Sequence, residues 1–337
     1  MTRMMTSPTH RHNSDMKQSE MLGGPFAARW NYCGNFPYSE KDGFAMLNSG
    51  RAAFECILRS MPRPRRVLVP RFICDTILEP LNRLELPVER YTVNEQLIPC
   101  PPADAGTQDL LLLVNYFGLT GEAVRAAALR HPGPVVVDAT TALYSAPLPG
   151  IPVFYSPRKF GPLSDGGVAS APFPLILPDE VDTSAERFFS LLVHTEQGTR
   201  CAAAYHQAAE DSLSMLYRRM SDITREMLTV PNWKDAAKRR LENYAELHAA
   251  LAPINRLQLP AIPEAAPMCY PLVCGIPGLR DELIDAGIAL PLYWPEVIEA
   301  TTADEPENML ARSLLPLPLD HRCTQEDMQR LVKLILG

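Results

Sequence analysis

The sequence predicts an α/β fold in which helices cover a largely parallel β-sheet. From residue 47 onward, short runs rich in leucine and β-branched residues alternate with segments of helical periodicity, which is the pattern of βαβ units. Two of these runs, residues 110–114 and 134–138, are almost wholly apolar, as expected for strands buried on both faces of a sheet. Functional side chains in such a fold follow the C-terminal ends of the strands.

Local signals place the elements of the first 230 residues in order. Ser49 and Gly50 open a helix whose apolar face includes Phe54 and Ile57, and Pro62 ends it. The other elements expected here are strands at 67–69, 87–93, 110–114, 134–138 and 151–155, a kinked helix at 76–84, and helices at 122–130 and 201–220.

Beyond residue 230 the pattern becomes more helical. A long charged helix is expected at 234–252, followed by a compact α+β set with a helix at 279–286. Thr324, with Asp327 three residues later, predicts an N-cap for the last helix. We therefore expect a disordered tail at 1–22, a large domain at 23–230 and a small C-terminal α+β domain at 231–337.

Composition excludes several classes of protein. The 337-residue chain has a net charge of -7 and no dense basic block, so nucleic acid is not an expected partner. The longest apolar run, near residues 110–117, is far shorter than the roughly 20 residues of a membrane span. Eight cysteines without CxxC or zinc-type spacing indicate reduced thiols and no metal. We expect a cytoplasmic protein that acts on a small molecule.

Lys159 is the first candidate for chemistry. It is the only lysine between residues 42 and 233, and it stands among apolar and glycine residues. Burial lowers the pKa of a lysine and so makes it a usable amine nucleophile toward aldehydes. The alternative is a surface lysine in a loop.

Two further features suit a phosphorylated cofactor. Asp138 ends a run of three valines, where a carboxylate needs a cationic or hydrogen-bonding partner such as a protonated pyridine nitrogen. The start of the helix at Ser49, Gly50 and Arg51 offers backbone amides to an anion, and Ser156 is placed to donate to the same phosphate. Alternatively, Asp138 is an N-cap or half of a buried salt bridge, and Ser49 is an ordinary N-cap.

Together and in chain order, these features resemble the fold-type I enzymes that use pyridoxal 5'-phosphate (PLP). More narrowly, they resemble the DegT/StrS family of sugar aminotransferases. The segments that carry the resemblance are residues 47–53, 67–70, 115–118, 137–140, the lysine segment 154–161 with the following Gly166-Gly167, 219–223 and 317–319.

The resemblance implies a mostly parallel seven-stranded sheet in the large domain and a homodimer with active sites at the subunit interface. It implies PLP bound to Lys159 as a Schiff base, with Lys159 also acting as the general base. The expected reaction moves an amino group, commonly from glutamate, to a keto sugar that is typically nucleotide-linked. Another PLP reaction, such as an elimination, and a non-catalytic dimeric binding protein are the alternatives.

The sequence departs from the family pattern near the cofactor. Thr141 stands where family members usually carry a glutamine, and Cys74 stands where an aromatic residue usually stacks on the cofactor ring. Phe72 is either a replacement for that aromatic or a plain core residue.

It departs also at the expected subunit interface. The segment usually reading Asn-Tyr-Arg-Met is Tyr217-Arg218-Arg219-Met220. Tyr217 or Arg219 is expected to replace the asparagine that reaches the partner's phosphate, unless the segment is a solvated helix face. Trp294 either borders the substrate cleft or packs between domains.

Overall fold

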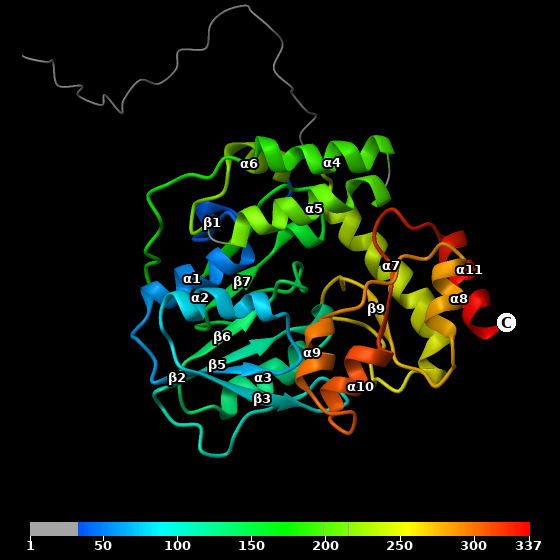
Figure 1. Cartoon of the computed structure of the whole chain (residues 1–337), viewed down its shortest axis with the longest axis horizontal. Helices are drawn as coiled ribbons and strands as arrows, with labels where there is room; N and C mark the ends of the chain where they lie inside the picture. Colours follow the sequence, from blue (N-terminus) through cyan, green and yellow to red (C-terminus); the bar gives the residue numbers. More distant parts are fainter. Residues whose placement is uncertain (1–32, 198, 215) are drawn as a thin grey trace, which may run out of the picture. The chain divides into compact units, whose positions relative to one another are not determined.

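An eight-stranded sheet is the framework of the fold (Figure 1), and the computed structural model describes residues 33–197, 199–214 and 216–337. The tail expected at 1–22 lies outside the described residues. The strand order is β1-β8-β7-β6-β5-β2-β3-β4. The strands are β1 Ala45–Leu47, β2 Arg66–Pro70, β3 Val88–Val93, β4 Pro99–Cys100, β5 Asp109–Val114, β6 Val135–Asp138, β7 Val153–Tyr155 and β8 Gly167–Ser170.

The sheet is mostly parallel, which confirms the predicted fold class. Strands β3, β2, β5, β6 and β7 run parallel, whereas β1, β8 and β4 pair antiparallel with their neighbours. The expected count of seven strands was one too low, because the two-residue β4 adds an edge to β3. Prolines at 99, 101 and 102 keep this edge strand short, since proline cannot donate to the ladder.

Helices cover the sheet and form most of the C-terminal part. One predicted helix was wrong at its end: α5 stops at Ser214, and Arg219 instead bridges to Leu47 and Val181. The preceding helix α4 was not predicted. The helices are α1 Gly50–Ser60, α2 Leu78–Arg83, α3 Gly121–Arg130, α4 Ala185–Gln197, α5 Thr199–Ser214, α6 Asp222–Leu228, α7 Trp233–Leu251, α8 Leu279–Asp285, α9 Pro295–Ala300, α10 Pro306–Ser313 and α11 Gln325–Leu336.

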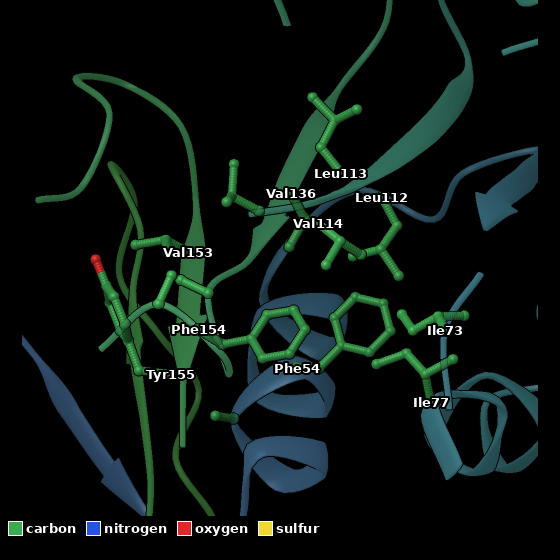
Figure 2. Packing of buried hydrophobic residues seen from close by; sticks show 14 of the residues in the cluster. Phe54, Ile73, Ile77, Leu112, Leu113, Val114, Val136, Val153, Phe154 and Tyr155 are labelled. Carbon is green, nitrogen blue, oxygen red and sulfur yellow. The ribbon is translucent and has the colours of Figure 1, made fainter. Parts of the chain in front are cut away.

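Helix α1 is fixed against the sheet by aromatic packing (Figure 2). The rings of Phe54 and Phe154 stack with centroids 5.0 Å apart, and both side chains are fully buried. The neighbouring strands β5 and β6 are buried along their whole length, as their apolar sequences predict. This packing holds the N-terminus of α1 beside the C-terminal ends of the central strands.

The C-terminal part has its own hydrophobic cluster. Side chains from α7, α8 and α11 enclose the antiparallel pair of β9 Tyr270–Leu272 and β10 Leu315–Leu317. The predicted capping box of Thr324 and Asp327 is present at the start of α11. The described residues belong to one compact unit, and a domain boundary near residue 230 stays a prediction. No helix in the described ranges is long and apolar enough to cross a membrane.

Candidate functional site

One cavity brings together most of the residues predicted for the site. Its volume is about 290 Å³, close to the lower end of the roughly 300–1,000 Å³ typical of small-molecule pockets. It lies where β5, β6 and β7 end and α1 begins. The predicted residues that line it are Ser49, Gly50, Arg51, Cys74, Asp138, Thr141, Ser156 and Lys159.

Lys159 ends a short 3-10 turn, Pro157–Lys159, that follows β7. Its Nζ donates a hydrogen bond to Thr140 Oγ1 at 3.1 Å. The side chain is solvent-accessible because it forms part of the cavity wall. Desolvation nevertheless lowers the pKa of Lys159, although the charge of Asp138 opposes this shift. The amine therefore loses its proton more readily than an ordinary lysine.

Asp138 is the last residue of β6 and is only 4% exposed. Its Oδ1 accepts a hydrogen bond from the backbone N of Thr140 at 2.8 Å. Burial raises the pKa of the Asp138 carboxyl, and the nearby Lys159 lowers it in part. A cation placed in the cavity would stabilise the ionised carboxylate.

The start of α1 approaches the strand ends closely at Gly50. A Cβ added there would lie 3.1 Å from Thr140 Cγ2 and 3.5 Å from Ser156 Cβ, so glycine preserves the space between these segments. Ser49 caps the helix by accepting from Ala52 N at 3.0 Å, and it also lines the cavity. The helix dipole favours an anion at this point.

Five polar side chains of the cavity were not among the predicted site residues: Thr76, Thr140, Arg158, Glu210 and Tyr293. Arg158 forms an ion pair with Glu210, which α5 supplies. Arg51 donates to both carboxylate oxygens of Glu79, at 2.8 and 3.0 Å. The position of Arg158 beside Lys159 was an available signal, whereas no local pattern pointed to Glu210.

Thr141 reaches the cavity, but its hydroxyl is occupied by the backbone. Its Oγ1 accepts from Phe117 N and donates to Asn115 O, both at 3.1 Å. Cys74 also lines the cavity, and its Sγ accepts from Thr76 Oγ1 at 3.2 Å. Burial raises the pKa of the Cys74 thiol, which keeps it protonated.

Phe72 is not among the residues that line the cavity. Its side chain is fully buried and meets Trp294 edge-on, with ring centroids 4.6 Å apart. Trp294 itself lines the cavity beside Tyr293. The aromatic wall of the cavity therefore comes from the segment before α9, with Phe72 behind it.

Tyr217 and Arg219 also lie outside the cavity. The Tyr217 hydroxyl donates to Ile176 O at 2.8 Å, and Arg59 lies over its ring. Arg219 donates to Asp179 O at 2.8 Å. Their expected contact with a partner subunit stays a prediction.

A larger cavity of about 670 Å³ lies between α3 and residues 257–262. None of the predicted site residues lines it, and it contains no lysine. Volume alone would favour this cavity, but the combination of a lysine, a buried carboxylate and a helix N-terminus favours the smaller one.

Solved structures provide the comparison with known proteins, since no family model and no curated protein matches the chain. Sugar aminotransferase CalS13 from Micromonospora echinospora is 19% identical, with a TM-score of 0.61 over 87% of this chain and 86% of that one. A DegT DnrJ EryC1 StrS aminotransferase from Brucella abortus is 16% identical, with a TM-score of 0.60 over 87% and 85%.

A third similar structure has a different reaction in its name. The GDP-4-keto-6-deoxy-D-mannose-3-dehydratase of E. coli with bound hydrated PLP is 13% identical, with a TM-score of 0.57 over 86% of this chain and 87% of that one. At these identities the likeness establishes the fold. The resemblance inferred from the sequence is confirmed at that level: the chain has the fold of the DegT/StrS-type sugar aminotransferases.

Proposed function

We propose that this protein is a PLP-dependent aminotransferase that moves an amino group from an amino acid, such as glutamate, to a keto sugar or its nucleotide-linked form. One observation carries the proposal: the Lys159 amine, the buried Asp138 carboxylate and the start of α1 share one cavity. The fold shared with structures named as sugar aminotransferases supports it.

The residues present fit the cofactor. Lys159 supplies the amine for its aldehyde, and Asp138 supplies an anion for its ring nitrogen. Ser49, Gly50 and Ser156 line the cavity at the start of α1 and would hold its phosphate there. When bound, PLP supplies an aldehyde carbon and an electron-withdrawing ring.

Side chains of the protein would then transfer the proton of the substrate carbon. Once an incoming substrate amine has released Lys159 from the cofactor, the lowered pKa of Lys159 would allow its Nζ to accept a proton from the substrate carbon and to return it at a neighbouring atom. Thr140 Oγ1 orients this nitrogen through the 3.1 Å hydrogen bond. Tyr293 and Trp294 form an aromatic wall that reduces the access of water.

Borohydride trapping tests the proposal. Protein incubated with PLP and then reduced should carry the cofactor covalently on Lys159, as located by peptide mass spectrometry. Lys159→Ala should lose the label, while Lys333→Ala, which removes an exposed lysine of α11, should keep it. Absence of label on Lys159 in the unmodified protein would reject the proposal.

Incubation with glutamate separates transfer from the second candidate, an elimination or dehydration. The likeness to a PLP-bound dehydratase favours considering it. A transferase should release 2-oxoglutarate in proportion to the bound cofactor and leave the aminated form of the cofactor. Labelled protein that releases no 2-oxoglutarate would contradict the choice of glutamate as donor and favour the second candidate.

We also propose that the protein acts as a cytoplasmic homodimer. Large apolar side chains are exposed on α4 and α5, including Phe189, Leu192 and Tyr205, which supports burial against a second copy. The described cysteines are free, which suits a reducing compartment. Light scattering on the purified protein should give the mass of two chains, and a monomer mass would refute the dimer.

A further inference from the structure

An acidic side chain from α5 lines the cavity in which the phosphate is expected. Glu210 lies near the C-terminal end of this helix and lines the cavity together with Ser49, Gly50 and Ser156. Its carboxylate binds the guanidinium of Arg158. An anion of the protein is therefore already present beside the predicted anion site.

The charges around Glu210 keep it ionised. Burial acts to raise the pKa of its carboxyl, but Arg158, Arg51 and Lys159 lower that pKa overall. Arg51 Nη2 lies 4.0 Å from Glu210 Oε2, yet Arg51 is held more closely by Glu79 at 2.8 Å. Arg158 is thus the main cation that Glu210 neutralises.

Arg158 is the less exposed member of this pair, and one of its donors has no acceptor in the described part of the chain. Its side chain is 19% exposed, whereas that of Glu210 is 49% exposed. The Nε atom of Arg158 is buried and has no hydrogen-bond partner among the described residues. Arg158 also lines the cavity, where an anion with several oxygens would accept hydrogen bonds from its guanidinium.

We propose that Arg158 binds the phosphate of the cofactor, and that Glu210 holds this position until the phosphate displaces it. The inference rests on the proposed function, because it assumes a phosphorylated cofactor in this cavity. Two anions cannot share one guanidinium without repulsion, so the phosphate and Glu210 compete. A phosphate has more acceptor oxygens than a carboxylate and binds the guanidinium in a bidentate manner.

Displacement has a consequence for α5. Among the described side chains, Glu210 is the only acidic group that pairs with Arg158, and this ion pair joins α5 to the turn that carries Lys159. Binding of the phosphate releases that link. The phosphate group thereby couples occupancy of the cofactor site to the position of α5.

The test compares the dissociation constants of PLP, inorganic phosphate and pyridoxal, which lacks the phosphate. Glu210→Gln should tighten binding of PLP and of inorganic phosphate by about fivefold or more, and should leave pyridoxal unchanged. Arg158→Gln should weaken binding of both phosphate compounds by roughly tenfold or more. The control is Glu186→Gln, which neutralises an exposed glutamate on α4 and should change none of the three.

The double variant isolates the competition. With Arg158→Gln already present, Glu210→Gln should no longer tighten phosphate binding, because the shared cation is gone. Weaker or unchanged phosphate binding in the single Glu210→Gln variant would overturn the proposal. Borohydride trapping of pyridoxal on Lys159 needs no phosphate, so its success alongside that result would overturn this inference alone, and its failure would reject the proposed function.

Discussion

Gly167 offers the sharpest structural test of how the cavity around Lys159 is built. It is the first residue of β8 and lies against the start of α1. A Cβ added at Gly167 would lie 1.9 Å from Ser49 O, 2.2 Å from Ser49 C and 2.8 Å from Gly50 N. These are backbone atoms, so no side-chain rotation relieves the overlap. The change Gly167→Ala must therefore move one segment away from the other.

The size of the effect follows from this overlap. The two segments must separate by about 1.5 Å, the difference between 1.9 Å and the 3.4 Å of an ordinary contact. Overpacking of this kind costs about 1–3 kcal/mol of unfolding free energy. Because a misplacement of about 1 Å in an active site costs about 100-fold, transamination should fall by at least that factor.

Urea unfolding followed by circular dichroism measures the stability, and the release of 2-oxoglutarate from glutamate in the presence of PLP measures the transamination. The control is Gly106→Ala, since a Cβ there would lie 3.8 Å from its nearest atom, Asp109 Oδ2, and both measurements should stay unchanged. If Gly167→Ala behaves like this control in both assays, the close packing of β8 against α1 does not shape the cavity.

Three further predictions concern titration and capping. Because burial lowers the pKa of Lys159, borohydride trapping of PLP should rise with pH and reach half its maximum below the ordinary lysine value of 10.5. Because burial raises the pKa of Asp138, its ionisation is favoured in the unfolded chain. In urea unfolding, the cofactor-free protein should therefore lose stability relative to Asp138→Asn as the pH rises. The loss should occur between the ordinary aspartate pKa of 3.8 and the higher pKa of the folded protein. It should amount to at most about 1.4 kcal/mol for each pH unit. Thr324→Ala should cost about 1 kcal/mol in the same assay by removing the capping box of α11.

Each of these has an outcome that contradicts it. A trapping midpoint at or above 10.5 would show that the Lys159 amine is not desolvated. If the stability of the wild type and that of Asp138→Asn change with pH in parallel, burial does not raise the pKa of the Asp138 carboxyl. Thr324→Ser keeps the hydroxyl and serves as the control for capping, so equal losses for serine and alanine would refute the role of that hydroxyl.

Local signals in the sequence were enough for the elements that depend on near neighbours. The helix after Ser49, the buried strand ending at Asp138 and the capping box at Thr324 each rest on residues within a few positions. The helix predicted at 201–220 ends earlier than predicted, because its last residues contact residues that are distant in the sequence. The backbone O of Arg218 accepts from Asn48 N, and Met220 N donates to Met46 O, a pairing that no local pattern reveals.

The candidate site likewise has features that local patterns predicted and features that only the fold decides. Thr141 was chosen by its spacing from Asp138, but the turn after β6 directs the Thr141 hydroxyl to the backbone of Asn115 and brings Thr140 to Lys159. The turn conformation, and not the spacing, decides which threonine meets the amine.

The sequence by itself determined an α/β chain with an isolated lysine, a strand-end carboxylate and a helix start suited to an anion. Each of these follows from residue type and local periodicity. Only the tertiary structure placed Glu210 against Arg158, which lies 52 residues earlier in the chain. Only the tertiary structure packed the ring of Phe72 against Trp294. Such contacts depend on how α5 and the segment before α9 pack onto the sheet, and no pattern of neighbouring residues encodes that packing.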